Sequence, residues 1–164
     1  MALSHHREHL TFSVGMKRFE EALTASQQSE SAQVIISSLI HLAQVLVDTD
    51  LQRARALLDE ALLAVAEVTD KRRRSEVLRT AAMILASEDA SRAASLSGAS
   101  AAYWRNPTLT DAEKRYLEEL VSRLKEELGE AEYESCYGEG FSHPDAFLDA
   151  AVASAAGSQA TSVE

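Results

Sequence analysis

The most concentrated group of chemically active residues is a run of four cations, Lys71-Arg72-Arg73-Arg74. Four neighbouring positive charges could bind phosphate groups or an acidic protein surface. They fall at a predicted helix start, where the helix dipole disfavours cations unless another group offsets them. Successive helical residues also point in different directions around the axis, so one coherent basic face is not expected. We therefore favour a solvated surface, and rank protein docking ahead of nucleic-acid binding.

Two adjacent aromatic residues, Tyr103 and Trp104, stand just before Pro107. Such side chains combine a large apolar area with a polar group, and could anchor a partner protein. Packing in the core or at a seam between helices is the favoured interpretation. The single cysteine, Cys136, lacks the motif of a catalytic nucleophile, and we expect it to pack as a small apolar residue.

Two further clusters could be interpreted as metal or catalytic sites. His5 and His9 are four residues apart and could share a helix face with His6 nearby, but the pattern fixes no carboxylate or cysteine ligand. A solvated terminus is the better interpretation. A group of glutamates could supply paired catalytic carboxylates, although their spacing favours a solubilising face. This group comprises Glu126, Glu127, Glu130, Glu132 and Glu134. We predict no bound metal and no cofactor.

Composition limits the class of protein. The chain has 164 residues, 46% hydrophobic and 5% aromatic, which predicts one helical domain with a substantial core. Its net charge is −10, and from Thr110 onward 13 acidic residues face 4 basic ones, so phosphate backbones would be repelled on average. One cysteine excludes an internal disulfide. With neither a signal peptide nor a membrane-length apolar run recognised, we expect a cytoplasmic protein without membrane contact.

A short pattern recurs at Phe19–Ala22, Leu58–Ala61 and Leu96–Ala99, in steps of 39 and 38 residues. Each copy has a large apolar residue three positions before an alanine. Because the segments between the copies are also predicted to be helical, each period would hold two helices. This is the unit of a tetratricopeptide-like α-solenoid, lengthened by about one helical turn from the usual ~34 residues.

Apolar spacing and cap residues predict the individual helices. Ile35, Leu39, Leu42, Ala43 and Leu46 share one face, and a second helix is predicted from Leu51 to Val68 with Asp50 as its N-cap. A third carries Leu78 to Leu85, and a small-residue helix inside the stack is predicted after the start signal Ser87-Glu88-Asp89, ending at Asn106-Pro107.

The C-terminal third is predicted to form a helical cap. Thr110-Asp111-Ala112-Glu113 fits a capping box, and that helix ends at Gly129. We expect a short helix from about Glu130 to Tyr137, closed by Gly138 and Gly140, and a last one started by Ser142-His143-Pro144-Asp145, whose signal fades after Ala156. The predicted fold is therefore all-α, an α-α superhelix of about three hairpins with this cap. It forms one domain over residues 1–156, followed by a frayed tail at 157–164.

The stretch from Arg92 to about Ala153 resembles the C-terminal end of the tetratricopeptide region in large bacterial signalling ATPases and LuxR- or SARP-class regulators. Five segments carry the resemblance: Arg92-Ala93-Ala94-Ser95-Leu96-Ser97-Gly98-Ala99, Pro107 to Glu113, Leu128-Gly129-Glu130, Tyr137-Gly138-Glu139-Gly140 and Asp145-Ala146-Phe147. It implies a helical sensor or interaction segment, which in that family commonly lies between a nucleotide-binding switch domain and an output domain.

The chain departs from that family in ways that limit what carries over. Tyr137 and Gly138 stand where the family often has tryptophan and alanine. The sequence lacks the G-x-x-x-x-G-K-[ST] phosphate loop, and we recognise no helix-turn-helix after Ala156, so neither ATP hydrolysis nor DNA recognition is carried over. The chain would be a stand-alone relative or a fragment of a longer regulator.

Together these observations predict a non-catalytic helical-repeat scaffold for protein–protein interaction in bacterial signalling or transcriptional regulation. Its expected partner is a protein such as a signalling ATPase or a transcriptional regulator. The candidate partner-binding residues are Arg72, Arg73, Arg74, Tyr103 and Trp104. The alternatives are nucleic-acid binding through Lys71–Arg74 and an enzyme using Glu130 or Glu134. Homo-oligomerisation and a small-molecule effector on the concave surface stay open.

Overall fold

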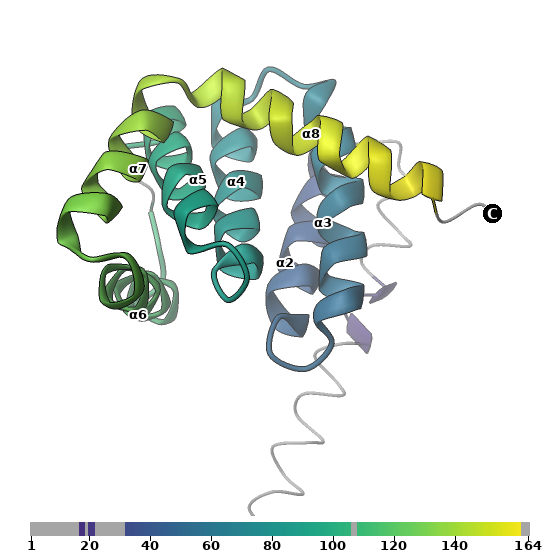
Figure 1. Ribbon diagram of the computed structural model, residues 1–164. Coiled ribbons are helices and arrows are strands. Elements are labelled where there is room, and N and C mark those ends of the chain that lie inside the picture. Colours follow the sequence, from purple (N-terminus) through teal and green to yellow (C-terminus); the bar gives the residue numbers. More distant parts are fainter. Residues whose placement is uncertain (1–16, 19, 22–31, 106–107, 162–164) are drawn as a thin grey trace, which may run out of the picture.

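The structure is a computed structural model that describes residues 17–18, 20–21, 32–105 and 108–161. Throughout this part of the chain the regular elements are α-helices (Figure 1), as composition and apolar spacing predicted. The helices with defined bounds are α2 (Ala32–Leu46), α3 (Leu51–Ala66), α4 (Lys71–Leu85), α5 (Ala90–Tyr103), α6 (Asp111–Leu128), α7 (Glu130–Ser142) and α8 (Pro144–Thr161). None of the helices in these residues combines the length and apolar character needed to cross a bilayer.

Short aspartate-capped turns start three of the helices. The Asp50 side chain accepts the backbone N–H of Arg53 at 3.0 Å, as predicted, and Asp89 accepts that of Arg92 at 2.9 Å. Asp70 begins α4 in the same manner. Each cap satisfies backbone donors that a helix start leaves unpaired, which is typically worth about 1 kcal/mol. These caps fix where α2 gives way to α3, and α4 to α5.

The four helices α2 to α5 lie side by side (Figure 1), and α4 packs against both α2 and α3. The predicted apolar faces supply the core, including Leu39 and Leu42 of α2, while Ile36 is buried in place of the half-buried Ile35. The second and third copies of the repeated pattern are buried in α3 and α5, through Leu58, Ala61, Leu96 and Ala99. Phe19 and Ala22, which define the first copy, lie outside the described residues.

Helix α5 is built from small residues, which let neighbouring backbones approach closely, and it is covered by α4, α7 and α8. A Cβ added to Gly98 would lie 2.0 Å from the Tyr137 carbonyl oxygen, and one added to Gly140 would lie 1.8 Å from that of Ser95. The prediction that Gly138 and Gly140 end α7 is therefore wrong, because the helix continues to Ser142. Gly140 instead allows the α7 backbone to lie directly against α5.

The remaining helices cover the ends of this group. The predicted capping box at Thr110 and Glu113 starts α6, and Gly129 ends it with a positive φ of 81°. Helix α8 crosses α3 and α5 (Figure 1) through buried Leu148, Ala151 and Ala155. It runs to Thr161, so residues 157–161, which were predicted to belong to a frayed tail, are helical. Burial stops after Ala155, which removed the apolar signal, but backbone hydrogen bonding continues the helix.

Candidate binding groove

A groove bounded by α2, α4 and α6 combines charged, polar and aromatic side chains. It consists of two adjoining pockets of about 290 and 270 Å³, which share His41, Gln44, Arg79 and Glu113. We refer to these as the first and second pocket. Helical spacing explains their walls, since Arg72, Glu76, Arg79 and Met83 recur along one side of α4, as Ser37, His41 and Gln44 do along α2.

The floor between the two helices is held by one polar contact. Gln44 Nε2 donates a 2.9 Å hydrogen bond to Thr80 Oγ1, and the Thr80 hydroxyl donates to the Glu76 carbonyl at 3.0 Å. Thr80 is fully buried, and its hydroxyl group both accepts a hydrogen bond from α2 and donates one within α4, so its polar atom is fully paired. The contact fixes the separation of α2 and α4 at the point where both pockets meet.

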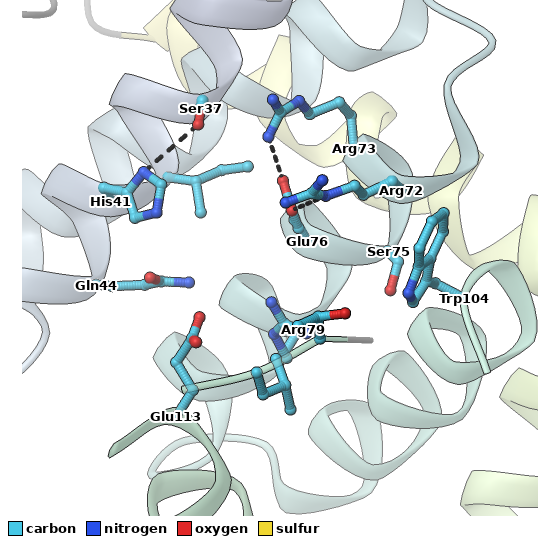
Figure 2. A pocket seen from close by; sticks show the side chains of 13 residues that line it. Ser37, His41, Gln44, Arg72, Arg73, Ser75, Glu76, Arg79, Trp104 and Glu113 are labelled. Carbon is cyan, nitrogen blue, oxygen red and sulfur yellow. Dashed lines mark hydrogen bonds and ion pairs between the residues drawn. The ribbon is translucent and has the colours of Figure 1, made fainter. Parts of the chain in front are cut away.

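The first pocket gathers three arginines and two glutamates (Figure 2). Glu76 accepts from Arg72 Nε at 2.9 Å and from Arg73 Nη1 at 2.6 Å, so two guanidiniums share one carboxylate. The Asp70 side chain accepts the backbone N–H groups of Arg72 and Arg73 at 2.9 and 3.3 Å. Together Asp70 and Glu76 offset the unfavourable position of these cations at a helix start.

Glu113 is occupied by the cap of α6. Its Oε2 accepts the Thr110 backbone N–H at 2.7 Å and the Thr110 hydroxyl at 2.9 Å. The backbone hydrogen bond is the main cause that lowers the pKa of Glu113, and the charge of Arg79 lowers it further. Burial lowers the pKa of Arg79, although Glu113 and Glu76 oppose that effect. Among the described residues, Arg79 has no carboxylate oxygen within ion-pair distance of 4.0 Å.

The structure divides the predicted partner-binding residues into two groups. Arg72, Arg73 and Trp104 line the first pocket, where the Trp104 side chain is 38% exposed. Arg74 and Tyr103 face elsewhere: Arg74 donates to the Val68 carbonyl at 3.0 and 3.2 Å and lies 5.8 Å from the Tyr103 ring. The two therefore join α4 and α5 to the start of α8 and do not line the groove.

Asp145 completes that second group. The Tyr103 hydroxyl donates to Asp145, and Arg74 Nη1 lies 3.8 Å from the same carboxylate. Burial first, and then Asp145, raise the pKa of Tyr103 to about 12. The division of the basic run follows from helical geometry, because Arg73 and Arg74 point about 100° apart around the axis.

Sequence reasoning named none of the residues that line the second pocket as a binding residue, and four of them are central to the groove. They are His41, Arg79, Glu113 and Tyr116. The spacing of Arg72, Glu76 and Arg79 was a usable signal, since offsets of four and three residues share a helix face. No comparable signal identified Glu113, which is brought to α4 from a helix more than thirty residues further along the chain.

The other predicted candidates lie away from the groove. Glu126, Glu127, Glu130, Glu132 and Glu134 are all solvent-exposed, and Lys125 pairs with Glu130 at 2.7 Å and Glu134 at 3.5 Å. Cys136 is half-buried, and burial raises the pKa of its thiol, with Glu132 acting in the same direction. His5, His6 and His9 lie outside the described residues. Within the described ranges, no three histidine, cysteine or acidic side chains converge as a metal site would require.

No protein family, curated protein or solved structure matches this chain. The resemblance of residues 92–153 to the helical region of bacterial regulators therefore stays a prediction from sequence. The groove itself offers hydrogen-bond donors, cations and an aromatic wall. This arrangement can bind a polar ligand or a peptide.

Proposed function

We propose that this protein is a non-catalytic helical scaffold that binds another protein along the groove between α2, α4 and α6. The observation that carries the proposal is the lining of that groove, where Arg72, Arg79 and Trp104 surround a cavity of about 290 Å³. Protein interfaces are enriched in arginine and tryptophan, because both contribute large contact areas with polar groups that direct binding.

A second observation extends the same surface. The two large apolar side chains that are exposed among the described residues are Val34, at 47%, and Trp104. Val34 precedes Ser37 and His41 by three and seven positions in α2, so the three residues share one side of the helix. An exposed tryptophan in the first pocket and an exposed valine one helical turn before Ser37 fit an extended protein segment better than a compact small molecule.

We further propose that the paired helices α2–α3 and α4–α5 are successive units of a tetratricopeptide-like superhelix. Their support is the burial of Leu58 and Ala61 in α3 and of Leu96 and Ala99 in α5, where the second pair lies one position nearer its helix start. In such a stack, the first helices of successive pairs line a continuous groove. The role in bacterial signalling or transcriptional regulation, the cytoplasmic location and the regulator-type partner rest on the sequence alone.

Binding of nucleic acid through Lys71–Arg74 is the less supported alternative. Arg72 and Arg73 share Glu76, and Arg74 is engaged by the Val68 carbonyl and Asp145. Lys71 and Arg72 are the exposed cations of the run. Two cations yield a small counterion-release term compared with the six to ten phosphate contacts of a typical DNA-binding protein. Catalysis by Glu130 or Glu134 is disfavoured because Lys125 lies between these exposed carboxylates.

Affinity purification from cells of the source organism tests the proposal. The tagged protein is compared with Arg72→Gln/Arg79→Gln, which changes the groove, and with Arg53→Gln/Arg115→Gln, which removes the same charge from side chains that do not line it. We expect at least one protein retained by the wild type and the control but lost by the groove variant. Partners that bind all three equally, with thermal unfolding unchanged, would refute a role for the groove.

A further inference from the structure

Positive charge in the first pocket is incompletely balanced. Three guanidiniums face two carboxylates, and both carboxylates already have partners. Glu76 is shared between Arg72 and Arg73, and Glu113 is held by the Thr110 cap. The Arg73 Nε atom is buried without a hydrogen-bond partner among the described residues. The pocket thus carries a surplus of cationic donors within a chain whose net charge is −10.

Arg79 is the centre of this surplus. Its side chain is half-buried, it belongs to both pockets, and Figure 2 shows it near Gln44 and Glu113 inside the cavity. A guanidinium stays charged in proteins even where burial makes the charge unfavourable. Partial burial of a cation without an ion-pair partner costs free energy that a bound anion would recover.

We infer that Arg79 binds a carboxylate of an acidic peptide segment that lies along both pockets, with an apolar side chain of the same segment against Trp104. This inference rests on the proposed function and specifies the partner's chemistry. The planar guanidinium matches a carboxylate in a bidentate arrangement. Trp104 stands at one end of the groove, and Met83, Tyr116 and Leu117 give the second pocket a more apolar wall at the other end.

A carboxylate fits the groove better than a phosphate does. Glu76 and Glu113 line the first pocket and Asp48 lines the second, so a ligand carrying nearly two negative charges would meet repulsion on several sides. A single negative charge matches the surplus of one cation in the first pocket. The two adjoining pockets are also too large for a small free carboxylic acid to fill. Such an acid would leave the apolar end of the groove empty.

Fluorescence anisotropy with three rhodamine-labelled octapeptides tests the inference. In these peptides one central residue is glutamate, glutamine or lysine and the other seven are the same leucines and serines, so the three share their apolar side chains and differ in charge only at that position. We expect the glutamate peptide to bind the wild-type protein at least 10-fold more tightly than the other two. Arg79→Gln should abolish that preference, whereas Arg53→Gln, which removes the same charge from α3 outside the groove, should preserve it.

The outcomes separate this inference from the proposed function. Equal binding of the glutamate and glutamine peptides, weakened by Trp104→Ala, would overturn the carboxylate preference and leave a protein-binding groove. Binding of none of the three would contradict the inference, while a protein captured by affinity purification through the groove would still support the proposed function. If the preference for the glutamate peptide persists in Arg79→Gln, the peptide carboxylate binds another residue and the inference is wrong. Competition by inorganic phosphate at equal concentration would also overturn the choice of a carboxylate.

Discussion

Replacing Gly140 by alanine is expected to destabilise the protein, although alanine is the better helix former. The new Cβ would lie 1.8 Å from the carbonyl oxygen of Ser95 and 2.6 Å from its carbonyl carbon. Both are backbone atoms of α5, so no side-chain rotation relieves the overlap and the two helices must separate. Overpacking of this kind costs about 1–3 kcal/mol, and the backbone contact places it at the upper end.

Gly138 supplies the matched control because it lies in the same helix with nothing within 4 Å of its added Cβ. Gly138→Ala should stabilise the protein by about 1 kcal/mol through helix propensity. Gly140→Ala gains the same term and loses about 3 kcal/mol, for a net loss of about 2 kcal/mol. The two variants should therefore differ by about 3 kcal/mol.

Thermal unfolding followed by circular dichroism measures that difference. For a protein of this size, 1 kcal/mol moves the unfolding midpoint by about 2–4 °C, so the Gly138→Ala protein should melt about 6–12 °C above the Gly140→Ala protein. Equal midpoints would refute the reasoning, because they would mean that α5 and α7 do not touch at Gly140. Gly98→Ala, which places a Cβ 2.0 Å from the Tyr137 carbonyl oxygen, should behave like Gly140→Ala.

Three further changes test the caps and the polar contacts. Asp70→Ala should lower the free energy of unfolding in urea by about 1 kcal/mol, whereas Asp70→Asn, which keeps an N-cap acceptor, should lose only a small part of that. Glu113→Gln should flatten the acid side of the stability profile. The lowered pKa of Glu113 makes its contribution complete above the usual carboxyl pKa and lost as the pH falls through the lowered value, so urea titrations from pH 7 to pH 3 report the change. Tyr103 should ionise near pH 12, so stability due to its neutral form declines as the pH rises from about 10 toward that value. Asp145→Asn should lower the pKa of Tyr103. The ionisation of Tyr103 is followed by its ultraviolet absorbance, with the spectrum of Tyr103→Phe subtracted in each background.

Local sequence patterns predicted the helix starts well where the residues involved have a single common structural role. Asp50 and the Thr110–Glu113 box begin helices because their side chains accept backbone donors within three residues, an interaction encoded wholly in the neighbouring sequence. Gly140 was misinterpreted because glycine has two uses, as a helix terminator and as a point of close approach. The second use depends on Ser95, which lies 45 positions earlier, and no local pattern contains that information.

The same limit applies to the groove. Arg72 and Trp104 were predicted as candidate binding residues from their types alone, and the packing of α4 against the segment before α6 brings them to one pocket. Arg79 was missed because it is a single arginine in an amphipathic helix, where a solvated surface position is the usual outcome. The role proposed for Arg79 depends on its lack of an ion-pair partner among the described residues, because the nearest glutamates are held by Arg72, Arg73 and Thr110.

Net charge describes the whole chain and does not describe the charge that a ligand would meet inside the groove. The excess of acidic residues predicts that anions are repelled on average, but charges farther away than about 8 Å are largely screened at physiological ionic strength. Within that distance a ligand in the first pocket meets the side chains that line it, where guanidiniums outnumber carboxylates. Added salt screens both the attraction at the groove and the repulsion from the rest of the chain, so the first effect lowers the affinity and the second raises it. Binding of the glutamate peptide that weakens as salt is added would show that the local term exceeds the global one.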